Sequence, residues 1–202
     1  MKLYYAPGAC SMAPHIVARE AGLPLELVKV DIPSKKTAAG DDFWQVNLKG
    51  YVPALMLDDG QVLTEVGVIC QYLADQKPDS GLVPKFGTME RYHQMEALNF
   101  AATEIHKQIG ALFNPKLTAD MREIQLATIG RRFDALEKML AGKSYVTGAQ
   151  FTAADAYLFT TLNWTKNLKV DLAKWPNIQA FIERVGARAK VQETLRAEGL
   201  LQ

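Results

Sequence analysis

A hairpin signal near residue 60 limits the folds open to this chain more than any other segment does. The apolar run Ala54–Leu57 is followed by Asp58-Asp59-Gly60 and then by a second β-prone run, Gln61–Thr64. An Asp-Gly pair favours a tight hairpin because glycine adopts the positive φ that such turns require. The segment Glu65–Asp75, which follows at once, has the apolar spacing of a helix. We therefore predict an antiparallel strand pair with a helix directly after it.

The first thirty residues predict a strand, a helix and a second strand. Lys2–Tyr5 is a short β-prone run that ends at Pro7-Gly8, Ser11–Ala21 has a helical pattern closed by a glycine, and Leu25–Val30 alternates apolar and polar residues. Two strands around one helix in so few residues favour parallel pairing. Together with the hairpin and its helix, this order is that of a thioredoxin-like α/β domain, which we place at residues 1–78.

The remainder of the chain predicts an all-α domain. Lys77–Pro84 contains two prolines and a glycine, which is typical of a linker, and we place this linker at residues 79–87. Beyond it, in residues 88–202, four segments carry apolar residues at spacings of three and four: Met89–Phe113, Ala119–Leu140, Ala153–Asn167 and Ile178–Ala187. Thr152 and Asp155 form a capping-box pattern that starts a buried helix.

Charge and cysteine content exclude several classes of function. Lys plus Arg number 23 and Asp plus Glu number 22, so the net charge of +1 gives no general attraction to nucleic acid or to an anionic membrane, and we expect neither partner. Two cysteines at this spacing match neither a disulfide framework nor a metal site, so we expect no metal. Without a secretory leader or an apolar run of transmembrane length, the expected compartment is the reducing cytoplasm.

Cys10 is the strongest candidate for a reactive group. It follows Pro7-Gly8-Ala9 at the predicted amino end of the first helix, where unpaired N–H groups and the helix dipole favour an anion. We therefore expect the pKa of the Cys10 thiol to be lowered. Cys70 lies in an apolar helical segment, and we interpret it as a buried structural residue. The three residues after Cys10 include no second cysteine, which argues against a dithiol reductase and for a glutathione-dependent enzyme.

The Val52-Pro53 pair directly before the strand at Ala54 is a second candidate feature. A cis prolyl bond is costly and is kept only where the fold uses it. Because this proline stands directly before a strand, we predict that the bond is cis. In thioredoxin-like domains this turn exposes the backbone of the preceding residue, so Val52 N–H and C=O can pair with an extended peptide as an added strand would. An ordinary trans turn is the alternative that the proline alone leaves open.

Five segments together resemble the bacterial beta-class glutathione transferases, and the resemblance covers essentially the whole chain. They are residues 2–11 (Lys-Leu-Tyr-Tyr-Ala-Pro-Gly-Ala-Cys-Ser), Tyr51-Val52-Pro53-Ala54-Leu55, Leu63-Thr64-Glu65, Glu104-Ile105-His106-Lys107 and Phe151–Phe159. The resemblance implies a thioredoxin-like domain joined to a helical domain, with glutathione as co-substrate.

The resemblance also implies which residues form the glutathione site. Cys10 and His106 face the sulfur, while Tyr51, Val52 and Pro53 carry the backbone that binds the tripeptide. The charged ends are held by Lys35 near the glycyl carboxylate and by Glu65 with the N–H of Val66 at the γ-glutamyl group. Asn99 and Glu104 lie at a subunit boundary where a partner chain completes the site, which implies a homodimer.

Physical chemistry makes these implied roles reasonable. Glutathione carries an ammonium group and two carboxylates, so Glu65, Lys35 and a helix amino terminus offer groups of complementary charge. A neutral or positive His106 favours a thiolate by donating a hydrogen bond to it. One departure stands out: where relatives often have Ser or Gly, Val66 offers an N–H but no hydroxyl. If that hydrogen bond is not replaced, glutathione binding is weakened by about 1 kcal/mol. His15 and His93 are interpreted as structural.

The leading functional hypothesis is detoxifying conjugation of glutathione to a small apolar electrophile bound between the two domains, next to Phe113 and Trp164. Two alternatives make Cys10 the nucleophile, in glutathione-dependent thiol–disulfide exchange or in reductive dehalogenation. A further alternative is a non-catalytic binding module with the same fold. Family membership does not fix the electrophile, because pocket side chains and loops vary within one fold.

Overall fold

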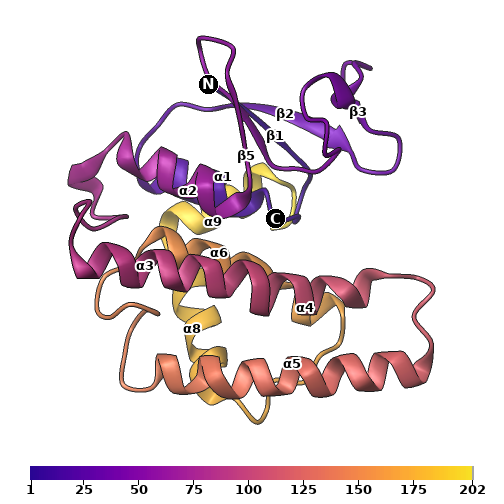
Figure 1. The fold of residues 1–202 in the computed structure, drawn as a ribbon, viewed down its shortest axis with the longest axis vertical. Coiled ribbons are helices and arrows are strands. Elements are labelled where there is room, and N and C mark those ends of the chain that lie inside the picture. Colours follow the sequence, from indigo (N-terminus) through magenta and orange to yellow (C-terminus); the bar gives the residue numbers. More distant parts are fainter. Residues whose placement is uncertain (202) are drawn as a thin grey trace.

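The computed structural model describes residues 1–201 and begins with the predicted order of strands and helices (Figure 1). Up to residue 75 the elements are β1 (Lys2–Tyr5), α1 (Met12–Glu20), β2 (Glu26–Asp31), β3 (Lys36–Thr37), a 3₁₀ turn (Phe43–Gln45), β4 (Ala54–Met56), β5 (Val62–Thr64) and α2 (Val66–Asp75). The predicted β-α-β unit, hairpin and following helix are confirmed. The two-residue edge strand β3 is absent from the prediction, because a polar two-residue strand leaves no periodic signal.

One mixed sheet contains all five strands, in the order β3-β2-β1-β4-β5. β1 runs parallel to β2, with Leu3 opposite Leu27, and antiparallel to β4, with Leu3 opposite Leu55. β4 and β5 form the predicted antiparallel hairpin, and Gly60 in its turn has a φ of 85°. This positive φ is what the Asp-Gly signal required.

The two faces of the sheet are covered differently. Along β1, Leu3 and Tyr5 point into the main core, which also contains buried residues of α1, α2 and the helices beyond them. Tyr4 points to the opposite face, where it packs on the buried Phe43 with ring centroids 5.6 Å apart. This alternation follows from the two-residue period of a strand. Figure 1 shows α1 and α2 between the sheet and the remaining helices.

The second half of the described chain is helical, as predicted. It comprises α3 (Met89–Phe100), a π-helical segment (Ala101–His106), α4 (Lys107–Gly110), α5 (Ala119–Leu140), α6 (Ala153–Leu162), α7 (Trp164–Asn167), α8 (Pro176–Gly186) and α9 (Ala189–Ala197), with 3₁₀ turns at Pro78–Ser80 and Ala111–Phe113. None of the helices in residues 1–201 is long and apolar enough to span a membrane.

Most predicted elements differ from the structure by one residue at an end, and three predicted helices of the second half differ by more. The predicted helix 89–113 contains the π-helical segment, and the predicted helix 153–167 is interrupted between α6 and α7. The helix predicted from Ile178 begins instead at Pro176, because proline is well suited to the first turn, where its missing N–H has no helical partner. α9 was not predicted, because its sequence is mostly polar and its two buried residues, Val191 and Thr194, give no clear apolar periodicity.

α6 lies at the centre of the molecule and all its residues are buried. It contacts α1 and α2 on the sheet side and α3 and α8 among the helices. Its predicted capping box is confirmed: one carboxylate oxygen of Asp155 accepts hydrogen bonds from the backbone N–H and the hydroxyl of Thr152, both at 2.8 Å. The other oxygen accepts the N–H of Val146 at 2.8 Å. Asp155 therefore holds both the start of α6 and the loop before it.

Removing this buried acceptor should destabilise the whole protein. In Asp155→Ala the N–H groups of Thr152 and Val146 lose their acceptor inside the core, and we expect a loss of about 3 kcal/mol in the free energy of unfolding. Urea denaturation followed by circular dichroism measures it. Asp120→Ala, an exposed acidic residue in the first turn of α5, is the matched control, with an expected change within about 0.5 kcal/mol. Equal stability of the two variants would contradict this role.

Candidate active site

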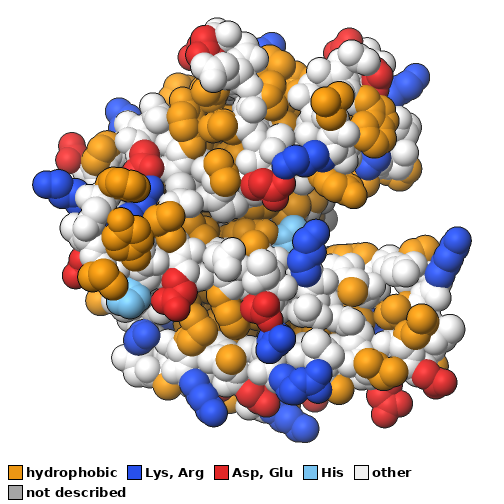
Figure 2. Space-filling view, viewed as in Figure 1, with side chains coloured by type: hydrophobic (Ala, Val, Ile, Leu, Met, Phe, Trp, Pro, Cys, Tyr) orange, Lys and Arg blue, Asp and Glu red, His pale blue; other side chains and the backbone are white. Residues whose placement is uncertain are grey.

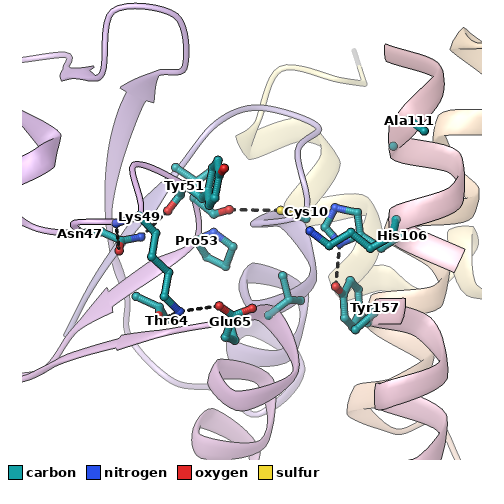
Figure 3. A pocket seen from close by; sticks show the side chains of 15 residues that line it. Cys10, Asn47, Lys49, Tyr51, Pro53, Thr64, Glu65, His106, Ala111 and Tyr157 are labelled. Atoms are coloured by element: carbon teal, nitrogen blue, oxygen red, sulfur yellow. Dashed lines mark hydrogen bonds and ion pairs between the residues drawn. The ribbon is translucent and has the colours of Figure 1, made fainter. Parts of the chain in front are cut away.

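A cavity of about 440 Å³ opens between the sheet half and the helical half of the chain. Figure 2 shows the hollow on the right of the molecule, between the strands above and helices α4 and α5 below. Figure 3 shows its lining from close by. The lining residues are Cys10, Asn47, Lys49, Tyr51, Val52, Pro53, Thr64, Glu65, Val66, Ala102, His106, Lys107, Gly110, Ala111 and Tyr157. Both halves therefore contribute walls to a single cavity.

Cys10 lies just before α1, in a tight turn after β1. The Ala9 N–H donates to Ala6 O at 3.1 Å, and the Cys10 thiol donates to Val52 O at 3.2 Å (Figure 3). The predicted lowering of the thiol pKa is wrong for the protein alone. Burial raises the pKa of Cys10 to about 12 and outweighs the backbone N–H groups of Cys10 and Ser11 and the charge of Lys107, which lower it. At neutral pH Cys10 is therefore a thiol, a hydrogen-bond donor.

The turn at Val52-Pro53 has the predicted cis bond. Val52 O already accepts the Cys10 thiol, and the side chain of Asn47 donates to Tyr51 O at 2.7 Å. Within residues 1–201 the N–H of Val52 has no acceptor. The backbone at Val52 thus offers an open donor at the cavity wall, beside a carbonyl that retains one lone pair.

His106 lies on the opposite wall, at the end of the π-helical segment. π-helical turns carry an extra residue and often occur at functional sites. The His106 Nδ1 is 2.7 Å from the Tyr157 hydroxyl, and its ring packs edge-on against Trp164 at a centroid distance of 5.0 Å. Burial raises the pKa of Tyr157, so the hydroxyl stays protonated. Because Nδ1 is the acceptor that the described chain offers this hydroxyl, we assign the His106 proton to Nε2.

His106 is neutral at physiological pH. Burial, with a smaller effect from the positive charge of Lys107, lowers the pKa of His106 from 6.5 to about 4. A neutral ring with its proton on Nε2 remains a hydrogen-bond donor. The helical wall therefore presents an uncharged donor, the imidazole N–H of His106, and the other wall presents an uncharged thiol, Cys10, whose proton is directed at Val52 O.

Charged groups gather at the α2 end of the cavity. Glu65 lies immediately before α2 and has a φ of 70°, a left-handed conformation that is costly for residues other than glycine. The Lys49 ammonium is 2.5 Å from Glu65 Oε1 and also donates to Thr64 Oγ1 at 3.0 Å. The N–H of Val66 is the first of the helix and has no acceptor within residues 1–201. This end of the cavity combines a carboxylate, an ammonium group and an open N–H.

The structure brings together seven of the ten residues predicted for the site and leaves three outside the cavity lining. Cys10, Tyr51, Val52, Pro53, Glu65, Val66 and His106 line the cavity. The three outside it are Lys35, whose ammonium donates to Gly50 O at 2.9 Å, Asn99, which is exposed on α3, and Glu104, which pairs with Arg132 at 2.6 Å.

The sequence prediction missed Lys49, Thr64 and Tyr157 as site residues. Lys49 is two residues before Tyr51, and Thr64 directly precedes Glu65. Their closeness to these predicted site residues could have identified them as part of the site. Tyr157 belongs to an apolar helix, and its pairing with His106, 51 residues away, has no signal in a single sequence.

Comparisons with known proteins agree with this geometry. The model of the glutathione S-transferase N-terminal domain matches residues 3–81, and that of the C-terminal domain matches residues 100–189. Glutathione S-transferase GstA of Escherichia coli O157:H7 is 44% identical over 99% of this chain and 100% of its own. This chain belongs to the glutathione S-transferase family. The fold, a thioredoxin-like α/β half followed by an all-α half, is the one predicted.

Solved structures of glutathione S-transferases are also similar to this chain. A glutathione transferase from Methylococcus capsulatus is 57% identical and has a TM-score of 0.97, with 99% of each chain covered. The beta-class enzyme of Sphingomonas chungbukensis is 43% identical, with a TM-score of 0.95 and full coverage of both chains. A sphingomonad glutathione S-transferase solved with glutathione is 42% identical, with a TM-score of 0.95, over 99% of this chain and 100% of the other. The beta-class resemblance is confirmed.

The lowered pKa of His106 predicts a pH-dependent stability. A folded-state pKa below the unfolded value contributes stability that is present above pH 6.5 and is lost as the pH falls from 6.5 towards 4. Wild type should therefore lose on the order of 2 kcal/mol more than His106→Asn over this window. Urea titrations at several pH values measure the difference. His93→Asn, at an exposed histidine, is the control and should follow wild type. Parallel curves for all three proteins would contradict the assignment.

Proposed function

We propose that this glutathione S-transferase conjugates reduced glutathione to small apolar electrophiles. One observation carries the proposal: the protonated Cys10 thiol and the neutral His106 imidazole, which is a donor, face one cavity from its two halves, and this cavity also offers the open N–H of Val52. In this proposal residues 1–78 bind glutathione, residues 79–87 are a linker, and residues 88–202 supply the electrophile side. The relatives named as glutathione S-transferases support it.

The proposed reaction needs no protein nucleophile. The thiol of glutathione gives its proton to solvent, the thiolate forms a bond to an electrophilic carbon, and the displaced group leaves with its electron pair. Donors aimed at the sulfur stabilise the thiolate, and the cavity orients it towards the second substrate. Lys107, on the same wall as His106, adds a positive charge that favours the same anion. In this scheme glutathione is the co-substrate.

Small side chains on the helical wall leave room for the electrophile. Ala102, Gly110 and Ala111 line the cavity beside His106. Next to them Trp164 contacts both His106 and Phe113, with the Phe113 ring centroid 5.5 Å from that of Trp164. Phe113 and Trp164 are both outside the cavity lining, and Phe113, which is 52% exposed, adds an open apolar surface beside Trp164. These features support an apolar, aromatic second substrate.

We also propose a homodimer in the cytoplasm. Tyr92, Met95 and Asn99 are exposed at helical spacing along α3, and the partly exposed Glu104 lies one turn beyond them. The exposed apolar side chains of Tyr92 and Met95 support an interaction surface on this face, and a partner chain along it would bring further polar groups towards the cavity. Cys10 and Cys70 are both free thiols, as a reducing compartment maintains them.

Cys10 is the less suitable nucleophile in this cavity. Thiol–disulfide exchange and reductive dehalogenation through Cys10 both require its thiolate, but burial raises the pKa of Cys10 to about 12. The donor role of a protonated Cys10 fits conjugation, in which the sulfur of glutathione attacks. A purely non-catalytic module is also the weaker proposal, because Cys10, His106 and the Val52 N–H all line the same cavity.

The substitution Cys10→Ala separates the candidate reactions. Conjugation to a chlorodinitrobenzene-type electrophile should persist at about a tenth to a hundredth of the wild-type kcat/KM, because His106 still donates to the thiolate. Reduction of a glutathione mixed disulfide should vanish. Steady-state kinetics and peptide mass mapping of glutathione adducts measure these outcomes.

Cys70→Ala is the matched control for this experiment. Cys70 is fully buried in α2, so its loss should lower stability and leave both activities in place. If Cys10→Ala still folds and binds glutathione but has lost conjugation completely, the supporting role of Cys10 is wrong and the residue is essential. Full retention of both activities would make Cys10 a structural residue.

A further inference from the structure

The Lys49–Glu65 pair at the α2 end of the cavity has no role in the reaction described above. Its two charges are 2.5 Å apart, and both side chains line the cavity. They are also accessible, with 50% of the Lys49 side chain and 66% of the Glu65 side chain exposed. Exposed ion pairs contribute little to stability. The pair can therefore open at small cost when a ligand offers better partners.

The γ-glutamyl end of glutathione is the chemical complement of this pair. It carries an ammonium group and a carboxylate on the same carbon, so its two charges lie side by side as those of Lys49 and Glu65 do. If this end enters between them, one protein ion pair is exchanged for two ion pairs with the ligand. The ammonium group then faces Glu65, and the carboxylate faces Lys49.

The carboxylate needs donors, and this end of the cavity has few. Val66 contributes its open backbone N–H, but its side chain is apolar and buried, so it supplies no hydroxyl. The remaining side-chain cation at this end is Lys49, held in place by Thr64 Oγ1 at 3.0 Å. Lys107, the other cation that lines the cavity, lies beside His106 on the opposite wall.

We infer that Lys49 is a specificity-determining residue that binds the α-carboxylate of the γ-glutamyl group and supplies the donor that the side chain of Val66 lacks. This inference rests on the proposed function, because it takes glutathione as the ligand. Lys49 and the Val66 N–H together bind the carboxylate, while Glu65 binds the ammonium group. Glutathione binding is then not weakened by the valine.

Calorimetric binding to Lys49→Met tests the role directly. The experiment compares the binding affinities of three ligands: glutathione, an analogue that lacks the α-carboxylate (4-aminobutyryl-cysteinyl-glycine), and γ-glutamylcysteine, which lacks the glycine. Losing a charged hydrogen bond should weaken glutathione and γ-glutamylcysteine by about tenfold each. The analogue without the α-carboxylate should bind wild type and Lys49→Met equally. Lys49→Arg should keep the wild-type affinity, since it restores the charge.

Lys85→Met, at an exposed lysine outside the cavity lining, is the matched control and should bind all three ligands as wild type does. Unchanged glutathione affinity in Lys49→Met overturns the inference. An equal loss for the analogue without the α-carboxylate also overturns it, because Lys49 then acts only through Glu65. A loss for glutathione without one for γ-glutamylcysteine assigns Lys49 to the glycyl carboxylate and overturns it as well. A wild-type protein that binds no glutathione overturns the proposed function itself.

Discussion

The site depends on the way the helical half holds the backbone of Gly8, two residues before Cys10. The Gly8 N–H donates to Glu198 Oε2 at 2.8 Å, and its C=O accepts the indole N–H of Trp164 at 2.8 Å. Both partners come from the helical half, Trp164 from α7 and Glu198 from the segment after α9. The same Trp164 packs against His106, so one side chain contacts both the loop that carries the thiol and the ring across the cavity. The relative position of the two sulfur-facing groups follows from these contacts.

The Glu198 carboxylate is itself fixed by a buried network. Its second oxygen lies 2.9 Å from Nδ1 of His15, and Nε2 of His15 accepts the Nε–H of Arg19 at 3.0 Å. Because Nε2 is an acceptor, the His15 proton is on Nδ1 and is donated to Glu198. A buried carboxylate without such partners would be strongly unfavourable. The structural interpretation of His15 from the sequence is thus confirmed, and the residue ties α1 to the segment that follows α9.

Sequence reasoning recovered what local physics determines. The Asp-Gly turn, the alternating strand at residue 25 and the capping box at Thr152 each leave their signature within a few neighbouring residues, and each is confirmed. Prediction from the sequence failed for properties that depend on contacts between residues far apart in the sequence. The pKa of Cys10 depends mainly on how deeply the thiol is buried in the folded chain, which no helix-terminus argument includes. The pairing of Tyr157 with His106 and the reach of Lys49 to Glu65 likewise arise only on folding.

The cavity supplies uncharged hydrogen-bond donors. These donors favour a thiolate on a bound ligand rather than on Cys10. Burial keeps the proton on Cys10 and keeps His106 neutral, so the His106 N–H can donate to an incoming sulfur, and the Cys10 thiol can do so by turning from Val52 O. The most direct test is an ultraviolet titration of the thiolate of glutathione bound to the wild-type protein. We expect the pKa of the bound thiol to lie well below that of free glutathione in the same buffer. An equal or higher pKa for the bound thiol would contradict it.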